Sequence, residues 1–436
     1  MSDLLWQPSP ARVENANVTR FRNWVNEKHS LKLDSFPALY DWSVASKEDF
    51  WPAIIDYVGL KAESWGDAVL VDGNKMPGAK FFPNARLNFS ENLLVRDDDT
   101  DALVFWGEDK VKTRISWCDL NIAVSKFSQA LRAEGIKKGD RVCGYMPNMI
   151  ETVIAMLGTA AIGATWSSAS PDFGVQGVVD RFGQIEPKLM ITVDGYHYNG
   201  KSHDIREKVR DVVDRITTIQ KVVIVKYAFD GTNTTGIRNG ISYDNFLAPF
   251  SPEKIVFEQV EFNHPLYVMF SSGTTGKPKC IVHGAGGTLL KQVSEHVLHC
   301  DVVPGDRVFY FTTCGWMMWN WLMGGLAAGA TLLLYDGSPF YPSGNILFDY
   351  ADAEGMTLFG TSAKYIDALA KAELKPRETH DLSTVRAMTS TGSPLAPESF
   401  DYVYRDIKSD IHLASISGGT DILGCFVLAC PVLPVK

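Results

Sequence analysis

The sequence has little of what marks a secreted, membrane-spanning or nucleic-acid-binding chain. Its seven cysteines are odd in number and form no Cys-x-x-Cys pair, so neither a disulfide framework nor a zinc site is indicated. No apolar run approaches the roughly 20 residues of a membrane-spanning helix, and the first residues lack the basic and apolar segments of a signal peptide. Acidic residues outnumber basic ones by 51 to 42, and the surface therefore lacks the basic face that nonspecific nucleic-acid binding needs. These absences predict a cytoplasmic protein with no membrane insertion and no nucleic-acid partner.

What the chain does have is enough apolar material for large cores, because 45% of its 436 residues are hydrophobic. From about residue 96, strand-like runs alternate with helical spacing, which predicts an α/β fold with largely parallel sheets covered on both faces. We expect an N-terminal cap region over residues 1–95, a first α/β subdomain over 96–240 and a second over 241–436. A turn-rich segment at 230–236 marks the boundary between the halves.

The most informative segment is a loop that follows a predicted buried strand at residues 266–270. It reads Ser-Ser-Gly-Thr-Thr-Gly-Lys-Pro-Lys from Ser271 to Lys279. Glycines let the backbone approach an anion, exposed N–H groups and hydroxyls donate hydrogen bonds, and two lysines supply positive charge. The spacing differs from that of the GxxxxGK[ST] phosphate loop. A plain surface loop is the alternative, but the strand before the loop and the lysines inside it favour phosphate binding.

This loop resembles the phosphate loop of adenylate-forming enzymes, whose pattern is roughly [ST]-S-G-[ST]-T-G-x-P-K-G, with Cys280 here in place of the last glycine. The resemblance implies two stacked αβαβα-type subdomains, as in the large N-terminal domain of those enzymes, with ATP and Mg²⁺ as ligands. It implies a catalytic role for Thr274, Thr275 and Lys277. It implies nucleotide binding for the other loop residues, which are Ser271, Ser272, Gly273, Gly276 and Lys279.

Two further segments match the same family. The turn at residues 392–394 offers flat backbone on which a purine can lie; alone it reads as a plain turn, and its position after the loop favours the nucleotide. Residues 417–421 resemble the family's Tyr-Gly-x-Thr-Glu segment. That resemblance implies that Thr420 bonds the α-phosphate and acts in catalysis, and that Asp421 helps to hold Mg²⁺, a role that suits a hard carboxylate oxygen. Nucleotide binding is implied for the remaining positions, which are Gly392, Ser393, Pro394, Ser417, Gly418 and Gly419.

An aromatic segment at residues 314–321 supplies a candidate wall for an acyl pocket. Trp316 matches a tryptophan that lines this pocket in acetyl-CoA synthetases, whereas Trp319 and Trp321 are expected to pack in the core. Gly418 falls where those enzymes have a second tryptophan that closes the pocket around acetate. The missing indole would leave a cavity, which predicts an acid longer than acetate and predicts that Gly418→Trp favours acetate.

Three basic residues outside these segments were also considered, and the sequence indicates no specific catalytic role for them. Lys201 matches a basic residue near the CoA 3′-phosphate in acetyl-CoA synthetases, and a solvated lysine in a turn is the alternative. His283 and His380 have no partner visible in the sequence, and both are interpreted as structural.

Residues 5–9, 82–89 and 168–174, together with 417–421, resemble acetoacetyl-CoA synthetases. The resemblance implies an AMP-forming ligase that joins acetoacetate to CoA through an acyl-adenylate, with propionate or butyrate as alternative acids. In the family, the ribose-binding aspartate and the C-terminal lysine lie downstream of these segments. We therefore expect that the chain is truncated before the lysine domain and is inactive alone. We also expect a frayed strand at residues 431–435. A noncatalytic half-protein that binds a nucleotide or an acyl group is the second interpretation.

Overall fold

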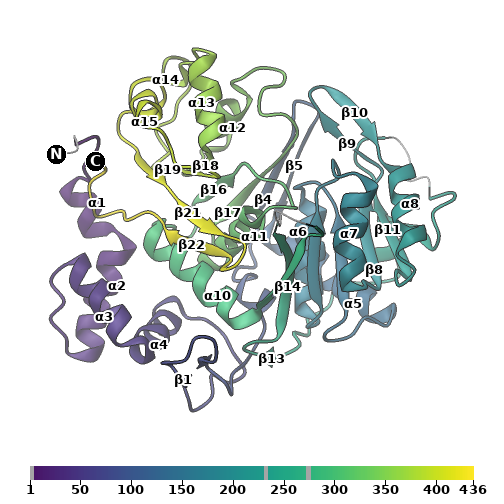
Figure 1. Cartoon of the computed structure of the whole chain (residues 1–436), viewed down its shortest axis with the longest axis horizontal. Coiled ribbons are helices and arrows are strands. Elements are labelled where there is room, and N and C mark those ends of the chain that lie inside the picture. Colours follow the sequence, from purple (N-terminus) through teal and green to yellow (C-terminus); the bar gives the residue numbers. More distant parts are fainter. Residues whose placement is uncertain (1–3, 230–233, 272–275) are drawn as a thin grey trace.

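A computed structural model describes residues 4–229, 234–271 and 276–436. Two seven-stranded sheets form its centre (Figure 1). In the first sheet the strand order is β12-β11-β8-β6-β7-β14-β15, with bounds Gly240–Ser242, Lys221–Val225, Leu189–Val193, Arg141–Tyr145, Thr165–Ala169, Pro265–Ser271 and Lys279–Gly284. In the second sheet the order is β20-β19-β18-β16-β17-β4-β5, with bounds His412–Ser415, Ala387–Thr391, Leu358–Ser362, Arg307–Tyr310, Thr331–Asp336, Asp101–Gly107 and Val111–Ser116.

Both sheets are parallel except at one edge. The β14–β15 pair closes the first sheet and the β4–β5 pair closes the second, each as an antiparallel pair, and the other neighbouring strands run parallel. Strand β8 is buried along its whole length and β17 along nearly all of it. Such continuous burial is expected of strands with helices on both faces. The predicted α/β fold with two largely parallel sheets is confirmed.

The predicted division of the chain at residue 240 is wrong, because the two sheets exchange strands. Strands β4 and β5 come early in the chain yet lie in the second sheet, where Leu332 pairs with Leu103. Strands β14 and β15 come later and lie in the first sheet, where Tyr267 pairs with Trp166. Alternating strand and helix patterns identify individual strands, whereas the neighbours of each strand depend on burial between distant segments, which no local pattern reports.

Helices cover the sheets and connect their strands. In chain order the α-helices after β5 are α5 (Trp117–Ala133), α6 (Ile150–Ala161), α7 (Val175–Ile185), α8 (Arg206–Arg215), α9 (Tyr243–Leu247), α10 (Ala285–Ser294), α11 (Met317–Met323), α12 (Ile346–Glu354), α13 (Ala363–Lys371), α14 (Pro376–Thr379) and α15 (Pro397–Tyr402). Short turns are 3₁₀-helical at η1 (Ser90–Asn92) and η3 (Gly324–Ala328), and π-helical at η2 (Glu295–His299) and η4 (Val403–Ile407). Helices α5 and α6 pack closely because Gly158 leaves room for the ring of Phe127.

Two-stranded hairpins and pairs lie outside the large sheets. They are β1–β2 (Leu70–Val71 and Lys80–Phe81), β3–β13 (Arg86–Leu87 and Val260–Glu261), β9–β10 (Gly195–Tyr198 and Lys201–Asp204) and β21–β22 (Ser417–Gly419 and Gly424–Val427). The last of these contributes to the site described below.

The N-terminal helices and the C-terminal tail lie together on one side of the molecule (Figure 1). The helices are α1 (Pro10–Asn15), α2 (Asn17–His29), α3 (Phe36–Ala45) and α4 (Lys47–Val58); α2 packs against η2 and α4 against α10. The tail is not the frayed strand that was expected. The N–H of Val435 donates to the Trp6 carbonyl at 2.9 Å, and the N–H of Leu5 donates to the Val435 carbonyl at 3.0 Å. These bonds satisfy backbone groups that a frayed end would expose.

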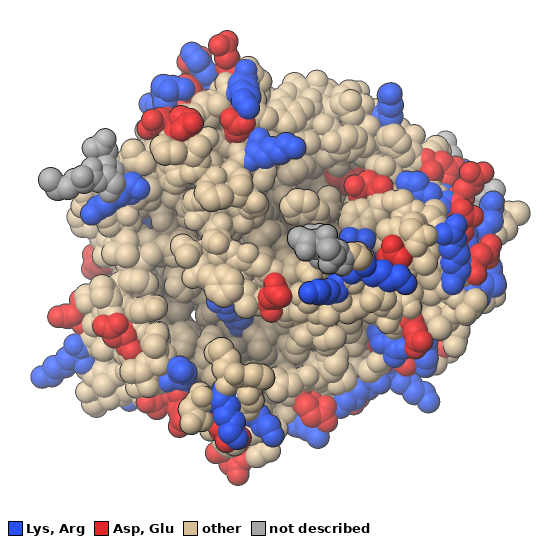
Figure 2. All heavy atoms as spheres, viewed as in Figure 1, with Lys and Arg blue, Asp and Glu red and all other residues tan. Residues whose placement is uncertain are grey.

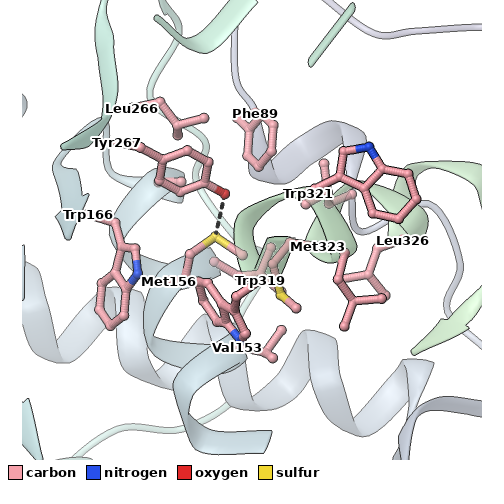
Figure 3. Packing of buried hydrophobic residues seen from close by; sticks show 14 of the residues in the cluster. Phe89, Val153, Met156, Trp166, Leu266, Tyr267, Trp319, Trp321, Met323 and Leu326 are labelled. Atoms are coloured by element: carbon pink, nitrogen blue, oxygen red, sulfur yellow. Dashed lines mark hydrogen bonds between the residues drawn. The ribbon is translucent and has the colours of Figure 1, made fainter. Parts of the chain in front are cut away.

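The main core lies between the first sheet, α6 and α11. Figure 3 shows Trp319 and Trp321 packed with the side chains around Met156, to whose sulfur the Tyr267 hydroxyl donates at 3.4 Å. Both indoles are fully buried, so their predicted packing role is confirmed, whereas Trp316 is 61% exposed. Across the described parts of the chain, no helix is both long and apolar enough to cross a membrane.

Candidate active site

A cavity of about 760 Å³ lies where the carboxyl ends of strands from both sheets meet. The face seen in Figure 2 is hollowed near its centre, where α11 and the β21–β22 hairpin lie in Figure 1. The cavity is lined by Phe173 and Arg181 and by residues 269–271, 315–318, 391–394 and 415–420. In open α/β sheets, ligands bind outside the carboxyl ends of the strands, so this cavity is the candidate active site.

Most of the described residues that the sequence singled out meet in this cavity. Those that line it are Ser271, Trp316, Gly392, Ser393, Pro394, Ser417, Gly418, Gly419 and Thr420. Those that do not line it are Lys201, Gly276, Lys277, Lys279 and Asp421. Ser272, Gly273, Thr274 and Thr275 lie outside the described residues. Ser271, at the start of the predicted phosphate loop, therefore meets the two later segments, although more than 100 residues separate it from the first of them.

The predicted phosphate loop connects the two strands of a β-hairpin. Ser271 of β14 pairs with Lys279 of β15, and Phe270 pairs with Cys280. Cys280, which replaces the family's glycine, therefore lies in an exposed edge strand beyond the turn. Gly276 has a positive φ of 100°, which favours glycine. The side-chain amide of Gln184 in α7 donates to the Pro278 carbonyl at 2.9 Å and braces the loop from the adjacent helix.

The turn after β19 presents open backbone to the cavity. Gly392 has a φ of 92°, and the space where its Cβ would stand is empty within 4 Å. Two hydrogen bonds attach this turn to strand β20 and the residue after it. The Leu395 N–H donates to the Ser415 hydroxyl at 3.1 Å, and the Ile416 N–H donates to the Ser390 carbonyl at 2.8 Å. The open backbone at Gly392, held by these hydrogen bonds, is suited to a flat aromatic ring.

His283 has a partner that the sequence did not reveal. The Nε2–H of His283, in β15, donates to the Thr420 carbonyl at 2.7 Å. Burial lowers the pKa of His283, with opposing effects from the Thr420 carbonyl and Asp421, so the ring stays neutral and donates from Nε2. The strand that leaves the phosphate loop thus holds the residue predicted to contact the α-phosphate.

The β21–β22 hairpin is also held by a buried ion pair that sequence reasoning missed. Glu295, 2% exposed at the start of η2, accepts the Cys425 N–H at 2.9 Å and the indole N–H of Trp321 at 2.7 Å. Lys291 lies 2.8 Å from Glu295 and donates to the Cys425 carbonyl at 3.1 Å. Gly424 is required beside this pair, because a Cβ there would stand 2.7 Å from the Glu295 carboxylate.

Gly418 borders the cavity, but the argument from a missing indole is wrong for this backbone. A Cβ on Gly418 would overlap the carbonyl oxygen of Gly424 in the partner strand. The space toward which a side chain would point is therefore filled by β22. Gly418→Trp would displace the hairpin and would not close an acyl pocket around acetate.

Arg181 is a cavity residue that the sequence gave no reason to single out. It lies in α7, and its guanidinium is 4.8 Å from the centre of the Phe173 ring and 6.0 Å from that of Phe270. Its one hydrogen bond among the described residues goes from Nη1 to the Gly177 carbonyl at 2.8 Å. Burial lowers its pKa, with a smaller opposing effect from Asp180. In a helical sequence pattern, a charged residue is normally assigned to the solvent-exposed face of the helix. Arg181 was missed for this reason.

Lys201 and Asp421 lie apart from the cavity lining. Lys201 is exposed at the start of β10, after a turn whose Asn199 and Gly200 N–H groups donate to the buried Glu108 at 2.6 and 2.9 Å. Asp421 is exposed next to Thr420. Within the described ranges no three His, Cys, Asp or Glu side chains gather as a metal site. A single carboxylate fits Mg²⁺ that is otherwise held by phosphate oxygens and water.

A family model described as AMP-binding enzyme matches residues 91–434. The chain belongs to the AMP-binding enzyme family. A second model, described as the acetyl-coenzyme A synthetase N-terminus, matches residues 36–93, which form the part of this AMP-binding chain to which the sequence assigned no chemistry.

Relatives within the AMP-binding family include acetoacetyl-CoA synthetases. The chain is 55% identical over 432 residues to the acetoacetyl-coenzyme A synthetase of Rhizobium meliloti (strain 1021), covering 99% of this chain and 66% of the relative. It is 45% identical over 434 residues to that of Xenopus tropicalis, covering 97% and 64%. It is 38% identical over 461 residues to a malonamoyl-CoA synthetase of Penicillium aethiopicum, covering 99% and 63%.

A solved structure of acetoacetyl-CoA synthetase from Streptomyces lividans matches with a TM-score of 0.94 at 40% identity, covering 100% of this chain and 67% of that chain. The predicted resemblance to acetoacetyl-CoA synthetases is confirmed. This AMP-binding chain spans about two thirds of the length of the relatives it matches.

Proposed function

We propose that the chain provides the nucleotide and acyl site of an acid–thiol ligase that converts acetoacetate, ATP and CoA to acetoacetyl-CoA, AMP and pyrophosphate. The 55% identity to the Rhizobium meliloti acetoacetyl-coenzyme A synthetase over 99% of the chain carries this proposal. The cavity is lined by Ser271 at the start of the phosphate loop, by the turn at residues 392–394 and by Thr420, and this arrangement supports the proposal. In the first step an acetoacetate oxygen attacks the α-phosphorus of ATP and pyrophosphate leaves. In the second the CoA sulfur attacks the acyl carbon and AMP leaves.

The proposed residue roles follow from the chemistry of the donors. Thr274, Thr275, Lys277 and Thr420 stabilise charge on the phosphates as it shifts during transfer. The purine lies on the turn at Gly392, which is open and rigid. Nucleotide contacts come from the remaining predicted positions, which are Ser271, Ser272, Gly273, Gly276, Lys279, Ser393, Pro394, Ser417, Gly418 and Gly419.

Mg²⁺ and CoA complete the proposal. Asp421 would hold Mg²⁺, which when bound offsets the negative charge of the phosphates. Lys201 would contact the CoA 3′-phosphate from the β10 edge, outside the cavity lining. A cytoplasmic location fits the seven cysteines, all of which are free.

The proposed acid is acetoacetate, and Trp316 is the proposed wall of its pocket, with the Gly418 backbone at its border. The acids named by the relatives share one feature, since acetoacetate and malonamate both carry a carbonyl oxygen on the carbon β to the carboxylate. Butyrate and propionate lack that oxygen.

Acid-dependent exchange of labelled pyrophosphate into ATP tests the function, and it is measured with the family's C-terminal lysine domain restored, because we expect the chain alone to be inactive. We expect exchange with acetoacetate to exceed exchange with butyrate, propionate and acetate. Equal or faster exchange with butyrate would contradict the acid assignment. AMP binding without exchange for any acid would favour the second candidate, a noncatalytic protein that binds a nucleotide or an acyl group.

A further inference from the structure

The segment at residues 168–174, which carried part of the resemblance to acetoacetyl-CoA synthetases, forms one wall of the cavity together with α11. The Ser168 hydroxyl donates to the Cys314 carbonyl at 2.7 Å, and the Phe173 ring lies within 3.1 Å of the space where a Cβ on Gly315 would stand. The Tyr145 hydroxyl donates to the Pro171 carbonyl at 3.1 Å and fixes the backbone of this segment. The segment therefore borders the proposed acyl wall at Trp316.

Arg181 reaches the cavity from α7 across this same wall. Its guanidinium carbon lies 4.8 Å from the centre of the Phe173 ring and 6.0 Å from that of Phe270, and these cation–π contacts hold the charged end of the side chain at this wall. Phe173 connects the arginine to Gly315 and so to the acyl side of the cavity.

Among the described residues, Arg181 retains donors without partners. A guanidinium carries five N–H donors, and one hydrogen bond from Arg181, to the Gly177 carbonyl, is formed among the described residues. No carboxylate of the described part of the chain lies within 4 Å to form an ion pair with it, in contrast to Arg386, which pairs with Asp306. A half-buried cation that keeps free donors in a cavity is suited to an oxygen of the ligand.

We infer that Arg181 is a specificity-determining residue that donates a hydrogen bond to the β-carbonyl oxygen of the acid. The inference rests on the proposed function and names the group that selects 3-oxo acids over saturated acids of the same length. A site that hydrogen-bonds one substrate group rejects the analogue without it, because its own polar group is then left buried and unpaired.

The experiment compares two stable acyl-adenylate mimics, 5′-O-sulfamoyladenosine carrying a 3-oxobutanoyl or a butanoyl group, with AMP as the reference ligand. Affinities are measured by calorimetry with the full chain, as wild type and as Arg181→Met, which keeps an apolar stem and removes the donors. We expect wild-type protein to prefer the 3-oxobutanoyl mimic by about tenfold or more. Arg181→Met should bring that ratio close to one, with AMP affinity unchanged within about twofold.

Arg210→Met in the adjacent α8 is the matched control, because Arg210 is an arginine bonded to the Gly236 carbonyl and lies outside the cavity lining. It should leave the ratio unchanged. If Arg181→Met does not fold, Arg181→Lys takes its place, and it should lower the ratio less, because lysine keeps the charge but lacks the planar fork.

The outcomes separate this inference from the function on which it rests. An unchanged ratio in the Arg181 variants overturns the inference and leaves the ligase proposal intact. Equal loss of affinity for AMP and both mimics also overturns it, since Arg181 would then bind the phosphate. Wild-type protein that binds neither mimic overturns the proposed function, and the inference with it.

Discussion

In the β21–β22 hairpin Gly418 pairs with Cys425 and Gly419 pairs with Gly424, and both Gly418 and Gly424 are constrained by backbone or charged groups. We expect Gly418→Ala to lower the free energy of unfolding by about 1–3 kcal/mol, because the new methyl group overlaps the Gly424 carbonyl and the strands must separate. Urea unfolding and AMP titration measure the effect.

Gly419→Ala is the control for this substitution. Its Cβ would meet only the Asp421 carboxylate, at an ordinary 3.9 Å, and its stability should stay within about 0.5 kcal/mol of wild type. If Gly418→Ala is as stable as Gly419→Ala, the hairpin has room that the structure does not show.

At the level of residues, the sequence identified which positions meet but not what holds them. Gly392 and Thr420 were identified because the segments that contain them resemble segments of adenylate-forming enzymes. The partner of His283 and the position of Arg181 were missed because each depends on an element more than 80 residues away. The volume argument at Gly418 failed because a residue type gives no direction for its side chain.

The Lys291–Glu295 pair joins η2 to β22 through its hydrogen bonds to the backbone of Cys425. We expect Glu295→Ala to lower the free energy of unfolding by about 2–6 kcal/mol, because the N–H groups of Cys425 and Trp321 then lie buried without an acceptor. Trp321 lies in the affected region, so its fluorescence should report a transition at lower urea concentration.

Glu295→Gln separates the hydrogen bonds from the charge. Glutamine keeps one acceptor oxygen but leaves Lys291 without its anion, so its loss of stability should be smaller than that of Glu295→Ala. Identical losses for the two variants would mean that the Cys425 and Trp321 bonds add nothing beyond the ion pair.

Element prediction succeeded where burial imposed a pattern. The apolar run at residues 189–193 has the bounds of β8, because a strand covered on both faces is a continuous apolar run. Strand β15 was missed because it lies at a sheet edge and is mostly exposed, so its sequence carries no period. Strand β21 was missed because Ser-Gly-Gly offers no side chains from which to read a face.

The contact between Tyr227 and Asp336 links the two sheets of the molecule. Tyr227 follows β11 of the first sheet, and its hydroxyl donates at 3.0 Å to Asp336 at the end of β17 of the second. Burial raises the pKa of Asp336 to about 7, with the Tyr227 hydrogen bond opposing the shift and Glu108 and Asp172 adding to it. The site that joins the sheets therefore holds a carboxyl group that titrates near neutral pH.

The sign of the resulting pH dependence follows from proton linkage. Between pH 4 and 7 the folded protein holds a proton on Asp336 that the unfolded chain has lost, so this residue makes stability fall as pH rises, by at most about 1.4 kcal/mol per pH unit. Asp336→Asn should gain stability relative to wild type from pH 5 to 7 and keep a constant difference above about pH 8. If the unfolding free energies of wild type and Asp336→Asn differed by the same amount at every pH in this range, Asp336 would not titrate there.

The exchange of strands between the sheets also has a consequence for synthesis on the ribosome. The β4–β5 hairpin leaves the ribosome about 220 residues before β17, the strand on which it finally packs. At about 5–20 residues per second, β4 waits for roughly 10–45 s before its neighbouring strand β17 is synthesised. During translation this hairpin is therefore available to a chaperone that binds extended apolar chain.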